Sequence, residues 1–191
     1  MSKLFALNVL SLDFKIYQLD ALFNLNQLEQ LSIQYRRVDA TEFTLADLSQ
    51  LSSLDSLVLF NTSIDNWQGL AEFTSLTKLF VQSADSDFAF NGVSYFPPTL
   101  RSFGIQGGYF AENNDLSKLS QLTSLGIHQN SQTNVVKDFG FLSFMPSAES
   151  LNLSGYLIAS LVDLPTQALR YFSVRLPNMG LTGNDLYAIE Q

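Results

Sequence analysis

Cysteine is absent from this 191-residue chain, and its absence excludes disulfide bonds and thiolate metal sites. Cations are also scarce, because ten lysines and arginines face 18 acidic residues, for a net charge of −8. Binding to nucleic acid or to anionic membranes needs clustered cations, so neither is expected. No apolar run approaches the ~18 residues of a membrane-spanning helix, so we expect no membrane insertion. The missing cysteine, and a start without the pattern of a cleavable signal peptide, favour a cytoplasmic location, with export by a non-cleaved route left open.

What the chain does have is an apolar template that recurs at intervals of 21 to 26 residues. Apolar residues stand at positions 1, 4 and 6 of each copy and often at position 11, as in LDSLVLFNTSI at residues 54–64. The copies begin at Leu4, Leu28, Leu54, Leu76, Leu100, Leu122, Ala148 and Leu169. A period in this range is typical of a repeat protein, so residues 1–191 are expected to form a single domain.

Positions 4 and 6 are apolar in every copy, and side chains two residues apart on a strand share one face. Position 4 is Leu7, Leu31, Leu57, Leu79, Phe103, Leu125, Leu151 and Phe172. Position 6 is Val9, Ile33, Leu59, Val81, Ile105, Ile127, Leu153 and Val174. Stacked parallel strands bury that face, and the returning segments cover it. Trp67, Leu70 and Phe73 recur every third residue after Ile64, which predicts short helical or 3-10 turns in the returns.

With these repeats the chain resembles the leucine-rich repeat proteins, nearest to the 22-residue type of bacterial internalins, from Leu4 to about Met179. The resemblance implies an α/β solenoid of about eight repeats, with a parallel β-sheet on the concave face and the returns on the convex face. It also implies protein binding as the commonest activity. One departure is position 9, where that family usually places an asparagine that bonds to neighbouring backbone. The residues here are Leu12, Arg36, Thr62, Ala84, Gly108, Asn130, Tyr156 and Pro177.

Positions 3, 5, 7 and 8 are expected to project from the concave face, and none of these 32 residues is acidic. Either a binding function or the avoidance of like-charge ladders between neighbouring strands accounts for this depletion. Val58, Phe60 and Phe80 are expected to form an exposed apolar cluster, which often marks a contact site. The alternatives are that they are ordinary scattered surface residues or that a return loop covers them.

Gly104 and Gly126 both take position 5, so they are expected side by side on neighbouring strands. Glycine within a strand often marks the close approach of another backbone. Together they would leave a shallow notch flanked by Phe80 and Asn152. The candidate partner-binding residues are Val58, Phe60, Lys78, Phe80, Gly104, Gln106, Gly126, His128 and Arg175.

The size of the concave face limits what it can bind. Eight strands at about 4.8 Å spacing extend roughly 34 Å, and a width of about 15 Å gives on the order of 500 Å², below the roughly 800 Å² per partner of a standard interface. We therefore expect a non-enzymatic protein-interaction module that receives a protein loop or a peptide. Two alternatives stay open: a scaffold that self-assembles through terminal strands near Leu7 and Phe172, and a bacterial effector or immunity-type binding protein.

Catalytic and cofactor sites are not expected. The single histidine, His128, has serines as neighbours on the predicted strands but no acid to orient its imidazole. The stretch DSDFAFNG at residues 85–92 lacks the spacing and the closing glutamate of a calcium loop. No lysine follows the glycines of residues 104–108 in the pattern of a phosphate-binding loop.

Overall fold

The computed structural model of the chain describes residues 9–13, 22–34, 44–61, 64, 66–83, 88–128, 136–137, 140–154, 157–158 and 168–175. The strands are β1 (Val9–Asp13), β2 (Gln30–Gln34), β3 (Ser56–Phe60), β4 (Lys78–Gln82), β5 (Phe88–Phe90), β6 (Ser102–Gln106), β7 (Gly108–Phe110), β8 (Ser124–His128), β9 (Val136–Lys137), β10 (Ser150–Ser154), β11 (Leu157–Ile158) and β12 (Tyr171–Arg175). The helical segments are the α-helix α1 (Leu45–Leu48) and the 3-10 helices η1 (Gln68–Glu72), η2 (Val93–Tyr95), η3 (Leu116–Gln121) and η4 (Gly140–Phe144).

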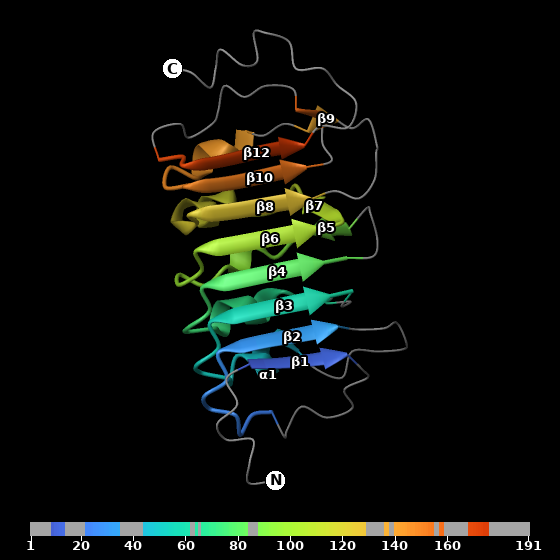
Figure 1. Cartoon of the computed structure of the whole chain (residues 1–191), viewed down its shortest axis with the longest axis vertical. Coiled ribbons are helices and arrows are strands. Elements are labelled where there is room, and N and C mark those ends of the chain that lie inside the picture. Colours follow the sequence, from blue (N-terminus) through green and yellow to red (C-terminus); the bar gives the residue numbers. More distant parts are fainter. Residues whose placement is uncertain are drawn as a thin grey trace.

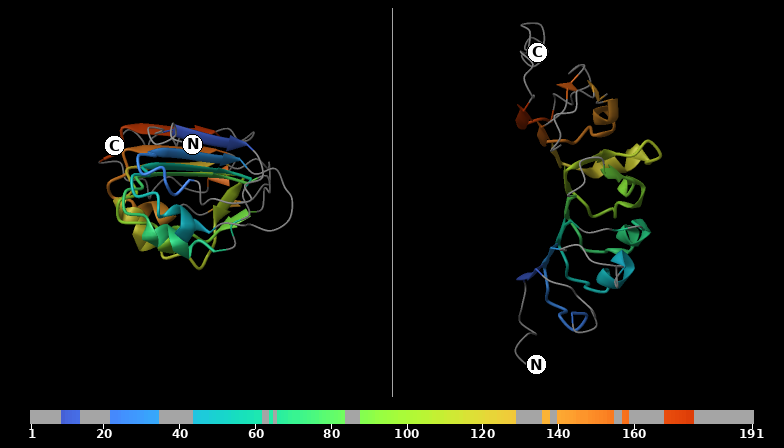
Figure 2. Two further views of the ribbon diagram at one scale, coloured as in Figure 1. Left: turned by 90° about the horizontal axis from the view of Figure 1, so that it is seen from below. Right: turned by 90° about the vertical axis from the view of Figure 1, so that its right-hand side faces the viewer.

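Eight of the described strands form one parallel sheet in the order β1-β2-β3-β4-β6-β8-β10-β12 (Figure 1). Each strand pairs with the equivalent strand of the next repeat, so that Leu57 of β3 lies opposite Leu31 on one side and Leu79 on the other. Seen edge-on, the sheet lines the inner side of an arc, and the helical returns lie on its outer side (Figure 2). The predicted α/β solenoid, with a concave parallel sheet and 3-10 returns on the convex side, is confirmed.

The core is built from positions 1, 4 and 6 of the repeat. From the second to the seventh repeat these side chains are at most 3% exposed, and in the eighth repeat Leu169 and Phe172 pack against them. Every buried side chain in the described part of the chain is apolar. The hydrophobic effect therefore holds neighbouring repeats together, since no single strand could bury its apolar face alone.

The first repeat lies three residues later than the sequence predicts. Strand β1 pairs with β2 so that Leu10 lies opposite Leu31 and Leu12 opposite Ile33, which makes Leu10 and Leu12 the residues at positions 4 and 6. The predicted assignment of Leu7 and Val9 to these positions is wrong.

The segment LFALNVLSLD offers two registers, because Leu7, Leu10 and Leu12 repeat the spacing of Leu4, Leu7 and Val9. Pairing with the neighbouring strand selects one of them. The shift also places Asp13 at position 7 of β1, opposite Gln34. In this register an acidic residue takes a position at which the sequence predicts none.

Two small parallel sheets, β5–β7 and β9–β11, add strands that the sequence did not predict. Gly107 separates β6 from β7 and has a φ of 82°, a left-handed conformation that glycine adopts without steric cost. Strands β5 and β7 carry Phe90 and Phe110, whose rings lie 5.0 Å and 6.0 Å from that of Phe103 between centroids. Further ring contacts extend this aromatic cluster, which comprises Trp67, Phe88, Phe90, Phe96, Phe103, Phe110 and Phe141.

An asparagine outside position 9 bonds to the backbone of two repeats. The side chain of Asn114 donates to the carbonyl oxygens of Phe90 at 2.8 Å and of Ala111 at 2.9 Å, and it accepts from the amide of Val93 at 3.0 Å. Asn130, which alone has asparagine at position 9, lies outside the described residues.

Hydroxyl groups just before position 1 supply a second series of links between repeats. Ser53, Ser75 and Thr99 each donate to a backbone carbonyl 23 to 27 residues earlier in the chain, at 2.6, 2.6 and 2.8 Å. Buried and half-buried carbonyls need such partners because water cannot reach them all.

The helical returns pack closely on the convex side. Thr44 caps α1 with a reciprocal pair of bonds, in which its amide donates to Asp47 Oδ2 at 2.8 Å and the Asp47 amide donates to its hydroxyl at 3.2 Å. Gly69 of η1 lies against α1 so tightly that a Cβ there would come within 2.8 Å of the carbonyl carbon of Leu45. None of the described helices is long and apolar enough to span a membrane.

Candidate functional site on the concave face

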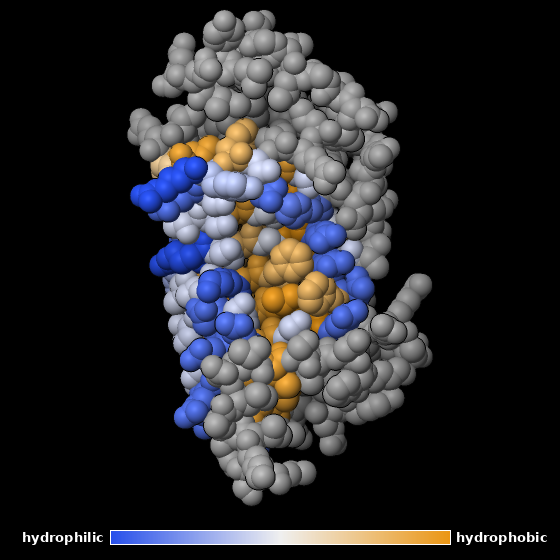
Figure 3. Space-filling model, viewed as in Figure 1, coloured by the Kyte–Doolittle hydropathy of each residue, from blue (hydrophilic) through white to orange (hydrophobic). Residues whose placement is uncertain are grey.

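Three rows of side chains cover the concave face of the sheet. Position 5 runs along the middle, with position 3 at the amino ends of the strands and position 7 at their carboxyl ends. Figure 3 shows the result as an apolar stripe with hydrophilic surface on both sides. Position 3 is serine in four of the eight strands, and position 7 carries Gln34, Gln82, Gln106 and His128 among the described residues.

The predicted apolar cluster forms in the middle of this face. Val58 lies opposite Phe80 in the register of β3 and β4. The rings of Phe60 and Phe80 meet edge to face, with centroids 6.0 Å apart and an interplanar angle of 60°. All three side chains are half-buried, so each presents part of its apolar surface.

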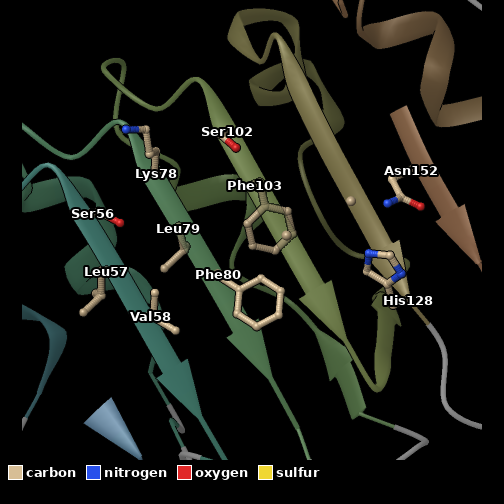
Figure 4. Close-up of a pocket in the computed structure, with 12 residues that line it drawn as sticks. Ser56, Leu57, Val58, Lys78, Leu79, Phe80, Ser102, Phe103, His128 and Asn152 are labelled. Atoms are coloured by element: carbon tan, nitrogen blue, oxygen red, sulfur yellow. The ribbon is translucent and has the colours of Figure 1, made fainter. Parts of the chain in front are cut away.

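The two glycines lie opposite each other as predicted, but only one of them leaves open space. Figure 4 shows the Phe80 ring leaning from β4 towards β6, and a Cβ on Gly104 would come within 2.6 Å of Phe80 Cδ2. Above Gly126 the nearest atom to such a Cβ is His128 Nε2 at 3.5 Å, an ordinary contact distance. The predicted two-glycine notch is therefore corrected: Phe80 fills it at Gly104, and it stays open at Gly126.

The open part belongs to a depression of about 220 Å³. Its lining comes from five neighbouring strands and consists of Ser56, Leu57, Val58, Lys78, Leu79, Phe80, Ser102, Phe103, Gly104, Gly126, His128 and Asn152. Six of these twelve residues are among the nine partner-binding candidates. Asn152, predicted only as a flanking residue, lines the depression because it lies opposite Gly126 in the register.

His128 stands at the carboxyl end of the depression with its two ring nitrogens in different surroundings. Nδ1 lies 2.7 Å from the hydroxyl oxygen of Ser154, which occupies the same position on the next strand. Burial lowers the pKa of His128 from its usual value of 6.5. Among the described residues, the hydrogen-bonding partner of this ring is a hydroxyl group and not a carboxylate.

The two predicted cations of this face differ in how the structure places them. Lys78 Nζ lies 3.4 Å from Asp55 Oδ2 and forms an exposed ion pair with it at the rim. Arg175 has its backbone in β12 opposite Ser154, and its side chain lies outside what the structure describes. Gln106 takes position 7 of β6, opposite Gln82 and His128.

Metal-binding clusters are not found among the described residues, where no three His, Asp or Glu side chains come together as a metal site would need. The second half of the stretch DSDFAFNG contains β5, whose Phe90 is fully buried. Residues 84–87 lie outside the described part of the chain.

Comparisons with known proteins give structural neighbours only, since no family model and no curated protein matches the sequence. The internalin InlF of Listeria monocytogenes superposes with a TM-score of 0.57 and 16% identity, over 93% of this chain and 56% of that one. Internalin C2 of the same organism has a TM-score of 0.57 and 19% identity, over 89% and 80% of the two chains.

A leucine-rich repeat protein of Leptospira interrogans superposes with a TM-score of 0.54 and 16% identity, over 88% of this chain and 42% of that one. This chain thus spans about half the length of InlF and less than half of the Leptospira protein. Identities this low establish the fold and nothing narrower, and that fold is a leucine-rich repeat solenoid.

Proposed function

We propose that this chain is a non-enzymatic protein-interaction module whose concave face receives a protein loop or an extended peptide. The observation that carries the proposal is the apolar cluster of Val58, Phe60 and Phe80 at the centre of the sheet. Val58 and Phe80 stand in the middle row, Phe60 stands beside them in the row at the carboxyl ends, and each side chain leaves part of its surface for contact with a partner. Apolar centres within polar rims are the usual anatomy of protein interfaces.

The shape of the face favours a narrow partner over a flat globular one. The sheet curves around the cluster, so the partner surface must be convex to reach it (Figure 2). A loop or peptide satisfies this condition with an area on the order of 500 Å², whereas a globular partner would need further contacts outside the sheet.

Peptides selected on the immobilised chain from a random display library provide the test. The double variant Phe60→Asp with Phe80→Asp places two charges in the proposed contact, and we expect it to weaken the selected peptides by about 30-fold or more, which corresponds to ~2 kcal/mol. Both side chains are half-buried on the surface of the sheet, so the core positions beneath them are unchanged.

The matched control is Phe144→Asp, because Phe144 is a phenylalanine of η4 that is 44% exposed on the convex side. We expect this variant to bind the peptides as the wild type does. Circular dichroism must show both variants folded. If folded Phe60→Asp, Phe80→Asp protein keeps the wild-type affinity, the concave site is wrong.

Self-association through the terminal strands is the second candidate function. The described sheet ends at β1 and β12, and Tyr171 of β12 is 55% exposed. Unpaired strand edges and uncapped repeats promote contacts between copies. Light scattering tests self-association, since a protein whose mass stays that of a monomer up to high concentration does not self-associate.

A further inference from the structure

The floor of the depression is open at one glycine. Gly104 is covered by the ring of Phe80, whereas a Cβ on Gly126 would meet nothing closer than 3.5 Å. Strands β4 and β10 lie three strand spacings apart, about 14 Å. The uncovered part of that span therefore lies over Gly126, between the ring of Phe80 and the amide of Asn152 (Figure 4).

The depression as a whole is small, so its part over Gly126 suits one side chain of a larger partner. At about 220 Å³ the depression is smaller than the roughly 300 Å³ at which small-molecule pockets begin. Its apolar wall is aromatic, since the Phe80 ring forms one side, and aromatic rings stack or pack edge to face on one another. An aromatic side chain from the partner therefore matches both the room and the wall.

The opposite end of the space is polar and sets a chemical condition on the occupant. His128 Nδ1 is engaged with Ser154, while Nε2 lies beside Gly126, 3.5 Å from where a Cβ would stand. The amide of Asn152 lines the same space. A purely apolar occupant would cover these groups without a hydrogen bond, which costs more free energy than the bond itself contributes.

A hydroxyl group meets that condition whichever way the imidazole is protonated. Either His128 Nε2 carries the proton and donates, or Nδ1 carries it and Nε2 accepts, and a phenol oxygen can accept or donate accordingly. An indole can only donate. A carboxylate can only accept, so it fits only the tautomer in which Nε2 carries the proton.

We infer that the space over Gly126, between Phe80, Asn152 and His128, is a subsite for a tyrosine side chain of the protein partner. The ring of the tyrosine lies against Phe80, and its hydroxyl reaches His128 Nε2. This inference rests on the proposed function and names the residue that the concave face recognises.

The single histidine of the chain gives a direct assay, because its ring signals in an NMR spectrum are unique. N-acetyl-L-tyrosinamide is the probe. We expect a saturable shift of the His128 ring signals, with a dissociation constant on the order of 20 mM for a fragment of this size. N-acetyl-L-phenylalaninamide, which lacks the hydroxyl, should bind about fivefold more weakly or worse.

The variant Gly126→Ala tests the floor itself, since its methyl group fits at an ordinary contact distance and occupies the space of the ring edge. We expect unchanged thermal stability within error and tyrosinamide binding weakened by about fivefold or more. Failure of tyrosinamide to give a saturable shift, equal binding of the phenylalanine analogue, or full binding to Gly126→Ala would each overturn the subsite.

The two proposals fail separately. If the selected peptides need Phe60 and Phe80 but bind Gly126→Ala with wild-type affinity, the concave face is the binding surface and the tyrosine subsite is wrong. If the peptides bind the double variant Phe60→Asp with Phe80→Asp as tightly as the wild type, the proposed interaction face is wrong.

Discussion

Replacement of Asn114 by alanine tests the side-chain bonds that join the fourth and fifth repeats. The substitution removes two bonds donated to the carbonyl oxygens of Phe90 and Ala111 and one accepted from the amide of Val93. Each such bond contributes about 1 kcal/mol net, and the Val93 amide is left without its acceptor. Because the site is half-buried and water reaches part of it, we expect a loss of about 2 to 4 kcal/mol in the free energy of unfolding.

Urea unfolding followed by circular dichroism measures that loss, and in a domain of this size it lowers Tm by about 6 to 12 °C. Hydrogen exchange adds a local readout, since the amide of Val93 should exchange faster when its acceptor is gone. Asn113→Ala is the matched control, because Asn113 is the adjacent asparagine and is exposed. A free energy of unfolding for Asn114→Ala within about 0.5 kcal/mol of that control would refute the reasoning.

Two further predictions concern glycine packing and pH. Gly69→Ala brings a methyl group against the backbone of Leu45, so we expect its free energy of unfolding to fall by about 1 to 3 kcal/mol. Gly126→Ala should leave the free energy of unfolding unchanged. Equal urea midpoints for the two variants would contradict the packing at Gly69. Burial lowers the pKa of His128 below 6.5, so the unfolded chain binds that proton more tightly than the folded one. The resulting contribution to stability is present above pH 6.5 and is lost as the pH falls through the lowered pKa of His128 in the folded state. We expect His128→Gln to remove this pH-dependent contribution, as measured by urea midpoints between about pH 7.5 and 5. If the urea midpoints of the wild type and His128→Gln differ by the same amount at every pH, this prediction is wrong.

The concave face shows how far side-chain alternation alone predicts a site. It places Val58, Phe80, Gly104 and Gly126 correctly in one row, because a parallel register repeats the same face on every strand. It cannot show that the Phe80 ring leans over Gly104, since that depends on a rotamer chosen in three dimensions.

The hydrogen bond between His128 and Ser154 was missed for a related reason. Both residues hold position 7 of successive strands, so the signal was present in the repeat alignment. Equal positions predict proximity, but the direction in which an imidazole turns is decided by its packed neighbours. The same holds for Asn114, which lies on a return without fixed repeat spacing.

The sequence by itself determines that this chain stacks short parallel strands into a solenoid, because apolar residues at positions 1, 4 and 6 can be buried only by neighbouring copies. Only the tertiary structure decides the register of the first strand, where two apolar spacings compete and pairing of Leu10 with Leu31 selects one. It alone also decides which glycine stays open, since Gly104 and Gly126 are equivalent in the repeat and differ only in whether a neighbouring ring covers them.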